Sequence, residues 1–452
     1  MPDIILLGFT GFTGRLIARY LLEHPQRGRF TWAVAARSKS KLNAVADQLE
    51  LPADVERVQL DVTNADDVDR VVKTTRVVIN AVGPFRLYGT SVVRACVRNA
   101  VHYVDITGET PWIRRIIAEF DYFATKTRAI IVPSCGFDSV VSDITAYLAN
   151  KTLKSAVNES GKDHVATSLT AYEYKGTMSG GSFTSLVEAL SERSLKNVST
   201  YARRSPLSIL SPVPGIRIPL FKPFYKLAIP GQKPLVGGFF IMRSVNVAVV
   251  QRTFGLLEVE AIRDKLRWPS GTQETAMVTK KQRYGPSFQY DEFIVTESTF
   301  QALLLSLSLL FGLALLMFVP PFRWVVQKIM PKSGEGPSDE KMETGYLIGT
   351  NLTTSAARPP ILVKTVSKLK GDPGYLVTAV MVSECALSLL LPPVSSKSTE
   401  TTATYSALPS LPPLAQKGGI LTPATAFGDV LVQRLQDSGR LQFSSSVVQR
   451  TS

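Results

Sequence analysis

The sequence predicts an α/β protein with two domains, in which a parallel sheet comes first and a mixed, largely antiparallel sheet follows. Over residues 1–140, short apolar runs alternate with helical patterns, as they do where helices connect parallel strands. Further on, the run TSLTAYEYKG at 167–176 alternates in the manner of a half-buried antiparallel strand. The 452 residues also exceed what one core usually needs, so two domains are the natural division.

The first domain can be laid out element by element along residues 1–140. The expected strands are 4–8, 31–37, 55–62, 76–82, 102–107 and 129–134, and the expected helices are 14–22, 41–49, 66–72, 91–99 and 111–127. The strand runs are short and apolar, whereas the helical runs are longer and amphipathic. This order predicts a parallel sheet that is covered by helices.

The second domain is expected over residues 141–400, beginning with a helix at 142–150. Residues 191–235 are rich in Pro, Lys and Arg and are expected to form a long irregular excursion or a surface-binding segment. Beyond the hydrophobic segment 302–321 we expect two strands around the turn 371–374, a helix at 377–391, a disordered Ser/Thr/Pro loop at 393–413, and a C-terminal helix and tail at 414–452.

The composition narrows the kinds of partner and site. Lys and Arg number 51 against 37 Asp and Glu, and the net charge of +14 favours anionic partners. Three cysteines and three histidines lie scattered along the chain, so we expect no disulfide framework, no metal site and a reducing compartment. Prolines interrupt the basic stretch 193–233, and nucleic acid is therefore not an expected partner. A homodimer is compatible with the sequence.

The most specific motif is IILLGFTGFTGR at 4–15, where three glycines lie three residues apart between an apolar strand and an amphipathic helix. A side chain at these positions would keep a pyrophosphate away from the backbone N–H groups at the helix N-terminus, where the helix dipole favours negative charge. The motif predicts a Rossmann dinucleotide-binding domain. Its expected cofactor-binding residues are Gly8, Thr10, Gly11, Phe12, Thr13 and Gly14.

The residues after the second strand predict which dinucleotide is bound. An NAD site usually offers an acidic residue to the ribose diol there, whereas this chain offers Arg37, Ser38 and Lys41. This favours the 2'-phosphate of NADP(H) over NAD(H), although such basic residues can also merely begin a solvated helix. Asp61 is expected to meet the adenine, and the nicotinamide half is expected to lie over Asn80, Ala81, Val82, Gly83 and Pro84.

Tyr88 is the candidate for a catalytic proton donor. It lies just past the expected nicotinamide strand, where its hydroxyl could protonate a carbonyl or an enolate while the cofactor delivers hydride. A buried structural tyrosine is the alternative interpretation.

Candidates for substrate binding lie at the carboxyl ends of the next strands, where ligands meet parallel sheets. The acidic and hydroxyl groups at 105–109 could orient substrate or cap the following helix. The cysteine at 135 has no histidine beside it, which favours a packing role, and paired glycines at 180 and 181 permit close backbone approach. The residues are Asp105, Thr107, Glu109, Cys135, Asp138, Gly180 and Gly181.

The run ALLLSLSLLFGLALLMFV at 302–319 has no charged residue and ends at Pro320-Pro321. As a helix it would be about 27 Å long, just short of a hydrocarbon core of roughly 30 Å. Strands before 300 and after 357 are expected in one sheet and cannot lie on opposite sides of a bilayer. We therefore expect a helix or hairpin that dips into one leaflet, with Phe322, Arg323, Trp324 and Lys328 as interfacial anchors; a buried core helix is the alternative.

Several longer motifs resemble the saccharopine dehydrogenase-like oxidoreductases, a family that includes the trans-acting enoyl reductases of bacterial lipid synthesis. The similarity covers nearly the whole chain. It rests on GFTGFTGR, AARSKSKL, VINAVGPFRLYG, ACVRNAVHYVDITGE, IIVPSCGFDSVVSD, SGGSFTSL, PKSGEGPS and GDPGYLVTA. The resemblance implies a Rossmann domain, a second α/β domain with a mixed sheet, and hydride transfer to a substrate held between them. Saccharopine itself is not implied, because no set of residues for its three carboxylates is evident.

Together these observations predict an NADP(H)-dependent oxidoreductase that reduces an activated double bond or a carbonyl of a lipid-like or polyketide-like substrate. The apolar segment predicts a place on the cytosolic face of a membrane: a lipid droplet, the endoplasmic reticulum or the outer mitochondrial surface. The N-terminus opens on a strand, and no secretory signal is expected. The alternative is a catalytically silent nucleotide-binding scaffold on a lipid surface.

Overall fold

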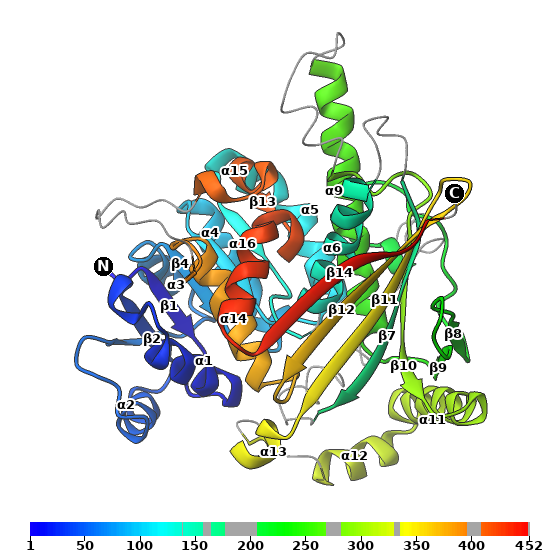
Figure 1. Cartoon of the computed structure of the whole chain (residues 1–452). Coiled ribbons are helices and arrows are strands. Elements are labelled where there is room, and N and C mark those ends of the chain that lie inside the picture. Colours follow the sequence, from blue (N-terminus) through cyan, green and yellow to red (C-terminus); the bar gives the residue numbers. More distant parts are fainter. Residues whose placement is uncertain are drawn as a thin grey trace.

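Two sheets lie side by side in the computed structural model of the chain, one at each side of the molecule (Figure 1). The structure describes residues 1–137, 139–156, 164–176, 206–267, 282–329, 335–395 and 408–450. Among these residues each sheet contains seven strands.

The first sheet is parallel throughout, with the strand order β13-β6-β5-β4-β1-β2-β3. The first six strands have the order of a dinucleotide-binding sheet, which confirms the predicted Rossmann domain. They are β1 (Ile4–Leu7), β2 (Trp32–Ala36), β3 (Glu56–Gln59), β4 (Val77–Asn80), β5 (His102–Asp105) and β6 (Ile130–Val132), and the seventh, β13 (Gly419–Ile420), comes from the far end of the chain.

Helices cover both faces of this sheet, because alternate strand residues point to opposite sides. Ile5 and Leu7 pack with α3 (Ala65–Val72), α4 (Phe85–Arg98) and α5 (Thr110–Thr127). Ile4 and Leu6 belong to the cluster on the other face, which is formed by α1 (Phe12–Glu23), α2 (Lys39–Gln48), α14 (Leu376–Ser388) and α16 (Pro423–Asp437). The structure thus places two late helices, α14 and α16, against the first sheet, and the chain does not divide cleanly at residue 140.

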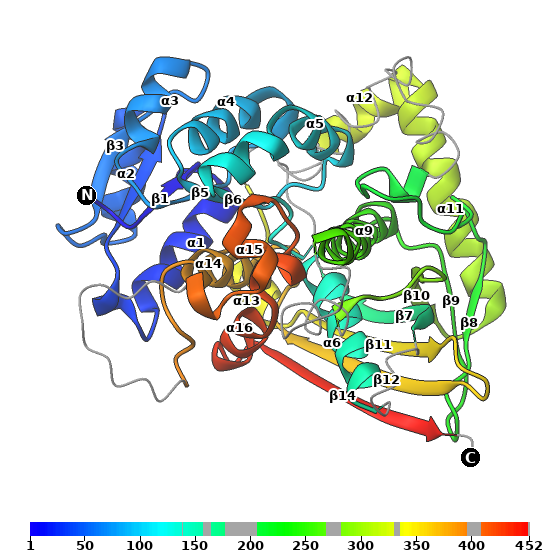
Figure 2. The same ribbon diagram turned by 90° about the horizontal axis from the view of Figure 1, so that it is seen from above.

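The second sheet has the order β14-β12-β11-β7-β10-β9-β8 and is mixed, as predicted. Its one parallel pairing among the described strands joins β7 to β10, and the other pairings are antiparallel. The helices α6 (Val140–Ala156) and α9 (Arg243–Arg267) lie against it (Figure 2). The strands are β7 (Val165–Lys175), β8 (Tyr225–Leu227), β9 (Leu235–Gly238), β10 (Gln289–Thr296), β11 (Tyr346–Ser355), β12 (Ile361–Lys370) and β14 (Leu441–Arg450).

A buried ion cluster ties the late helices to the first domain. Glu384 of α14 lies 2.7 Å from Nε of Arg434 on α16 and 3.0 Å from Nε2 of His24, which follows α1. The hydroxyl of Tyr20 donates to the same carboxylate. Burial by itself would raise the pKa of Glu384, but these partners lower it below its ordinary value. The ionised carboxylate therefore connects three helices in the core.

Four segments differ from the sequence-based expectations. Part of the basic segment 191–235 is regular, because Tyr225 of β8 stacks on Phe293 of β10 and continues the second sheet; residues 191–205 lie outside the described chain. The turn at 371–374 joins β12 to α14, so the hairpin is β11–β12 instead. In the loop 393–413, residues 408–410 form a 3₁₀ turn and 396–407 are not described. The segment 414–452 contains the rest of α15 (Pro413–Lys417), β13, α16 and β14, so its end is a strand and not a tail.

The apolar segment forms α11 (Thr299–Phe318), followed directly by α12 (Pro320–Ile329). The helix α11 has a mean hydropathy of 2.2, yet only 11% of it is buried, so the interpretation as a core helix is wrong. It touches the protein through Ala302 and Ser306, whose hydroxyl accepts a hydrogen bond from the backbone N–H of Phe239. β10 and β12, the strands before 300 and after 357, belong to one sheet, as predicted.

Candidate functional site

The glycine turn is shaped by contacts between its own backbone and β4. Gly8 has a φ of +82°, and a Cβ there would lie 2.8 Å from the carbonyl carbon of Ala81. A Cβ on Gly14 would lie 2.2 Å from the carbonyl oxygen of Gly8, so the strand and the helix need both glycines. Gly11 differs: its φ is −77°, and the nearest atom to an added Cβ is 3.2 Å away. A Cβ on Gly11 would therefore meet only that one atom, the carbonyl oxygen of Gly8, at a tight distance, and would otherwise face open space.

The N-terminus of α1 is suited to hold an anion. Gly11 is the N-cap and offers no side chain to the first-turn N–H groups, which have no acceptors within the helix. These donors and the helix dipole form a cradle for a pyrophosphate. Thr10 and Thr13 are half-buried at the same turn, and so is Phe12, the first residue of the helix.

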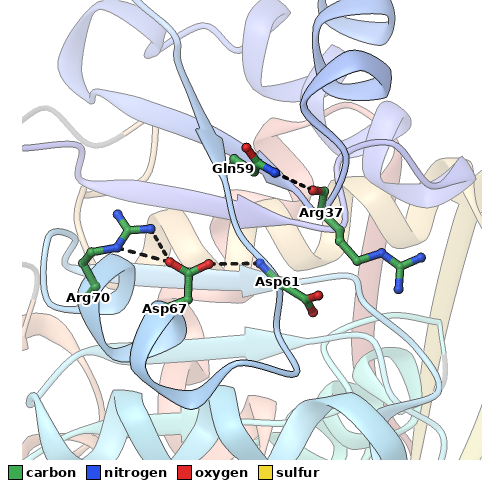
Figure 3. A pocket seen from close by; sticks show the side chains of 5 residues that line it. All are labelled: Arg37, Gln59, Asp61, Asp67 and Arg70. Carbon is green, nitrogen blue, oxygen red and sulfur yellow. Dashed lines mark hydrogen bonds and ion pairs between the residues drawn. The ribbon is translucent and has the colours of Figure 1, made fainter.

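A polar pocket of about 400 Å³ opens after the second and third strands, and Figure 3 shows the side chains that line it. Arg37 lines this pocket and its side chain is exposed. The hydrogen bonds from the N–H and hydroxyl of Thr63, together with the charge of Arg37, lower the pKa of Asp61. The guanidinium of Arg37 and the ionised carboxylate of Asp61 therefore face one pocket. The guanidinium suits the 2'-phosphate of NADP(H), whereas the carboxylate would repel that group. The lining residues are Arg37, Gln59, Asp61, Asp67 and Arg70.

Three of these lining residues were not predicted from the sequence. Gln59 donates to the backbone carbonyl of Arg37, and Asp67 pairs with Arg70 on the first turns of α3. In the sequence, Asp67 and Arg70 look like ordinary solvent-exposed residues of a helix. Their place in the pocket follows only from the fold, which sets α3 beside the ends of β2 and β3. Of the other residues predicted after the second strand, Ser38 caps α2 by accepting a hydrogen bond from the backbone N–H of Lys41, and the side chain of Lys41 is exposed.

The segment 81–84, which follows β4, is held in place by hydrogen bonds that involve β5, the neighbouring strand, and the residues after it. Asn80 accepts from the N–H of Val82 and donates to the hydroxyl of Tyr103, which donates in turn to Asp105. Both carboxylate oxygens of Glu109 accept backbone N–H groups, from Phe85 and Arg86, each at 2.8 Å. Glu109 therefore caps the N-terminus of α4, beside the turn at Ala81, Gly83 and Pro84. The helix that it was expected to cap is the following one, α5, and its side chain makes no cap hydrogen bond there.

Asp105 organises the turn that follows β6. One of its carboxylate oxygens accepts the N–H groups of Thr107 and Ser134, and the Ser134 hydroxyl donates to the carbonyl of Thr107. Burial raises the pKa of Asp105 to about 7. Ser134 and Ser139 both have positive φ values, of 62° and 110°, and strained backbone of this kind clusters at functional sites. Asp105 and Thr107 thus stabilise a strained turn at the carboxyl end of the sheet.

The remaining candidates fall into three situations. Tyr88 is half-buried in the first turn of α4, next to the expected nicotinamide segment, and keeps its candidacy as a proton donor. Cys135 is fully buried, and burial raises the pKa of its thiol, which is the opposite of what a nucleophile needs. Asp138, Gly180 and Gly181 lie outside the described residues.

A buried polar network in the second domain was not predicted. Glu292 of β10 accepts hydrogen bonds from Ser142 of α6, Tyr290 and Asn246 of α9, at 2.7–2.9 Å. The hydroxyl of Ser139, in the strained turn, contacts the amide oxygen of Asn246 at 3.4 Å. Burial raises the pKa of Glu292 to about 7. This carboxyl therefore connects the second sheet to the turn beside the first.

The strand order, the uncapped glycine turn and the position of Arg37 after the second strand define a dinucleotide-binding protein. Comparison with known proteins makes this specific. Residues 4–203 match the family model of the saccharopine dehydrogenase NADP binding domain. A putative trans-acting enoyl reductase of Mycobacterium tuberculosis is 31% identical over 455 residues, which cover 97% of this chain and 96% of that protein. The chain belongs to this saccharopine dehydrogenase-like family of oxidoreductases, and its first domain binds NADP(H).

Two further proteins are similar to this chain over nearly its whole length. The trans-acting enoyl reductase of Mycobacterium ulcerans is 26% identical over 457 residues, covering 97% of this chain and 96% of that protein. Among solved structures, apo saccharopine dehydrogenase (L-Glu forming) from Saccharomyces cerevisiae superimposes with a TM-score of 0.47 and 14% identity, over 99% of this chain and 100% of that one.

Proposed function

We propose that this oxidoreductase uses NADPH to reduce an activated double bond or a carbonyl in a lipid-like or polyketide-like substrate, at a membrane or lipid-droplet surface. The observation that carries the proposal is the alignment with enoyl reductases, which extends over 97% of the chain and so includes the second domain. Bound NADPH would supply the hydride. The chain has to hold the acceptor beside β4 and to deliver a proton, for which Tyr88 is the candidate.

The surface of α11 and α12 supports a lipid-like substrate and a lipid surface. Large apolar side chains on α11 are exposed, including Phe300, Leu304 and Phe311, at 60–74% of their area. On α12, Lys328 lies over the ring of Trp324 at 3.6 Å, a pair suited to a headgroup layer. Exposed apolar area of this kind on a soluble protein marks an interaction surface.

The sheet topology restricts how this surface could meet a membrane. β10 precedes α11 and β11 follows α12, and both strands pair with β7. The two flanks therefore lie on one side of any bilayer, and α11 would enter one leaflet only. Arg323 turns the chain here, since its guanidinium donates to the carbonyls of Leu316 and Met317 at the end of α11. We propose the cytosolic face of a lipid droplet, the endoplasmic reticulum or the outer mitochondrial membrane.

Turnover tests the enzymatic part of the proposal. The purified chain is mixed with NADPH and a long-chain enoyl thioester or a lipid extract, and the loss of NADPH absorbance is recorded together with the product mass. We expect a product heavier by two hydrogens and no reaction with Gly11→Val, which blocks the cofactor. Binding of NADPH without any oxidation across such substrates would instead support the catalytically silent scaffold.

Cell fractionation tests the lipid surface. The double variant Leu304→Asp and Phe311→Asp changes two exposed positions and should leave the fold intact. We expect the wild-type chain in the membrane or droplet fraction and the variant in the supernatant. Tyr122→Asp, at a 65% exposed site on α5, is the matched control and should fractionate like the wild type. A wild-type chain found wholly in the supernatant contradicts the proposal.

A further inference from the structure

The phosphate-binding turn of the first domain is in contact with the second half of the chain through Phe12. This residue begins α1, between Gly11 and Thr13, and its own backbone N–H belongs to the first turn of the helix. Its ring meets the ring of Tyr375 edge-on, with centroids 5.4 Å apart and planes at 81°. Tyr375 is buried and is the N-cap residue of α14. The Phe12 ring is therefore fixed on one side by a residue more than 360 positions away in the sequence.

The backbone at Gly336 contacts the same ring. A Cβ added to Gly336 would lie 2.5–2.6 Å from three carbons of the Phe12 ring, closer than any side chain tolerates. No positive φ is involved, so close approach to the ring is the reason for glycine here. Gly336 lies between α12 and β11, in the motif PKSGEGPS, which is far in sequence from the glycine turn of the first domain.

The segments that carry Gly336 and Tyr375 are joined by hydrogen bonds between residues 342–345 and residues 371–375. The backbone N–H of Asp372 donates to the carbonyl of Met342, and the N–H of Gly371 donates to the carbonyl of Gly345. The Asp372 carboxylate accepts the N–H of Tyr375. Short helix α13 (Asp339–Glu343) anchors these segments, with buried Met342 in the main core. Figure 1 shows α11, α12 and α13 following one another along the lower edge of the molecule.

We propose that Gly336 and Tyr375 are positioning residues for the cofactor, which hold Phe12 so that the first-turn N–H groups of α1 stay directed at the pyrophosphate. Both residues would act through Phe12, without touching the cofactor. A shifted Phe12 ring carries its own N–H and the adjoining N–H of Thr13 with it, and hydrogen bonds to a charged group weaken steeply with such misalignment. The proposal depends on NADP(H) binding alone and goes beyond the proposed substrate.

The test is the affinity of the full chain for NADPH and for adenosine 2'-phosphate, which carries the 2'-phosphate but no pyrophosphate. In Gly336→Val we expect NADPH to bind about tenfold more weakly, as the loss of one charge-assisted hydrogen bond would cause, with the affinity for adenosine 2'-phosphate unchanged. Gly28→Val is the matched control, since nothing lies within 4 Å of a Cβ at Gly28. It should bind both compounds like the wild type.

A double-mutant cycle adds a second readout. Phe12→Ala alone should also weaken NADPH binding, and Gly336→Val should cost nothing further in that background, because the ring it displaces is gone. Tyr375→Leu should behave like Gly336→Val. The proposal is overturned if Gly336→Val binds NADPH normally, if both compounds lose affinity equally, which indicates a general loss of fold, or if the effects of Phe12→Ala and Gly336→Val simply add.

Discussion

Replacing Glu292 by glutamine should change how the stability of the protein depends on pH. The carboxyl is buried beside Ser142, Asn246 and Tyr290, and burial raises its pKa to about 7, against an ordinary value of 4.5. Because the pKa is higher in the folded state, the contribution of Glu292 is fully present below pH 4.5 and is lost as the pH rises through 7. The wild-type chain should therefore pay a stability cost at alkaline pH that the variant avoids.

The size of this cost follows from the two pKa values. A difference between about 7 and 4.5 corresponds to about 3 kcal/mol in the free energy of unfolding when the carboxyl is fully ionised. Between pH 5 and pH 8.5 the wild type should lose about 2 kcal/mol or more relative to Glu292→Gln. The amide can replace the protonated acid, since its oxygen can accept from Asn246 while its NH₂ group donates to the hydroxyls of Ser142 and Tyr290.

Urea unfolding at pH 5 and pH 8.5 measures this difference. Asp105 and Asp143 also have pKa values raised by burial, to about 7 and about 6, so the wild-type curve reflects all three carboxyls and only the comparison with the variant isolates Glu292. Glu173→Gln, on the exposed side of β7, is the control and should follow the wild type. Equal pH dependence in Glu292→Gln and the wild type would refute the reasoning.

Three predictions concern the first domain. Arg37→Ala should weaken NADPH binding by about tenfold or more and leave NADH binding unchanged, because only the 2'-phosphate meets the guanidinium; titration with both cofactors checks this, and an unchanged preference would remove Arg37 from the site. Gly11→Val should abolish cofactor binding in a folded chain, whereas Gly14→Val should unfold the turn, since its Cβ would lie 2.2 Å from a backbone oxygen; circular dichroism beside the titration separates the two. Tyr88→Phe should lower turnover at unchanged NADPH affinity, and full turnover would leave Tyr88 a structural residue.

The first sheet was predictable because each of its first six strands follows a local rule. A short apolar run between helical patterns predicts a parallel strand, and the glycine spacing at 8, 11 and 14 predicts the turn. The seventh strand was not predictable, since Gly419 and Ile420 alone carry no periodicity. For α14, the apolar run predicts that a helix forms but not where it packs. The structure shows that it packs against α1, β4 and β5 of the first domain.

The candidate site divides in a similar way. Arg37 follows directly on β2 and Asp61 lies two residues after β3, so position along the chain predicts their shared edge. The sequence offered Glu109 as a substrate-orienting residue or a cap of the following helix, whereas its carboxylate accepts two N–H groups of α4, the helix before it. Local sequence gave no indication of that contact. Glu292 carried no recognisable signal, and Gly336 lay in a family motif without an assigned role, because the partners of both residues belong to other elements far away in the chain.

The late arrival of β13 and β14 has a consequence for biosynthesis. β13 forms an edge of the first sheet and β14 an edge of the second, and both lie in the last 34 residues of the chain. A ribosome that has made the complete nucleotide-binding motif has still to make α14, which covers one face of that sheet, and α16. The first sheet therefore lacks its edge strand β13, and the second sheet lacks its edge strand β14, until these late residues have been made. Part of the apolar surface of each sheet therefore stays uncovered until these later elements have been made, and transiently exposed apolar surface favours aggregation.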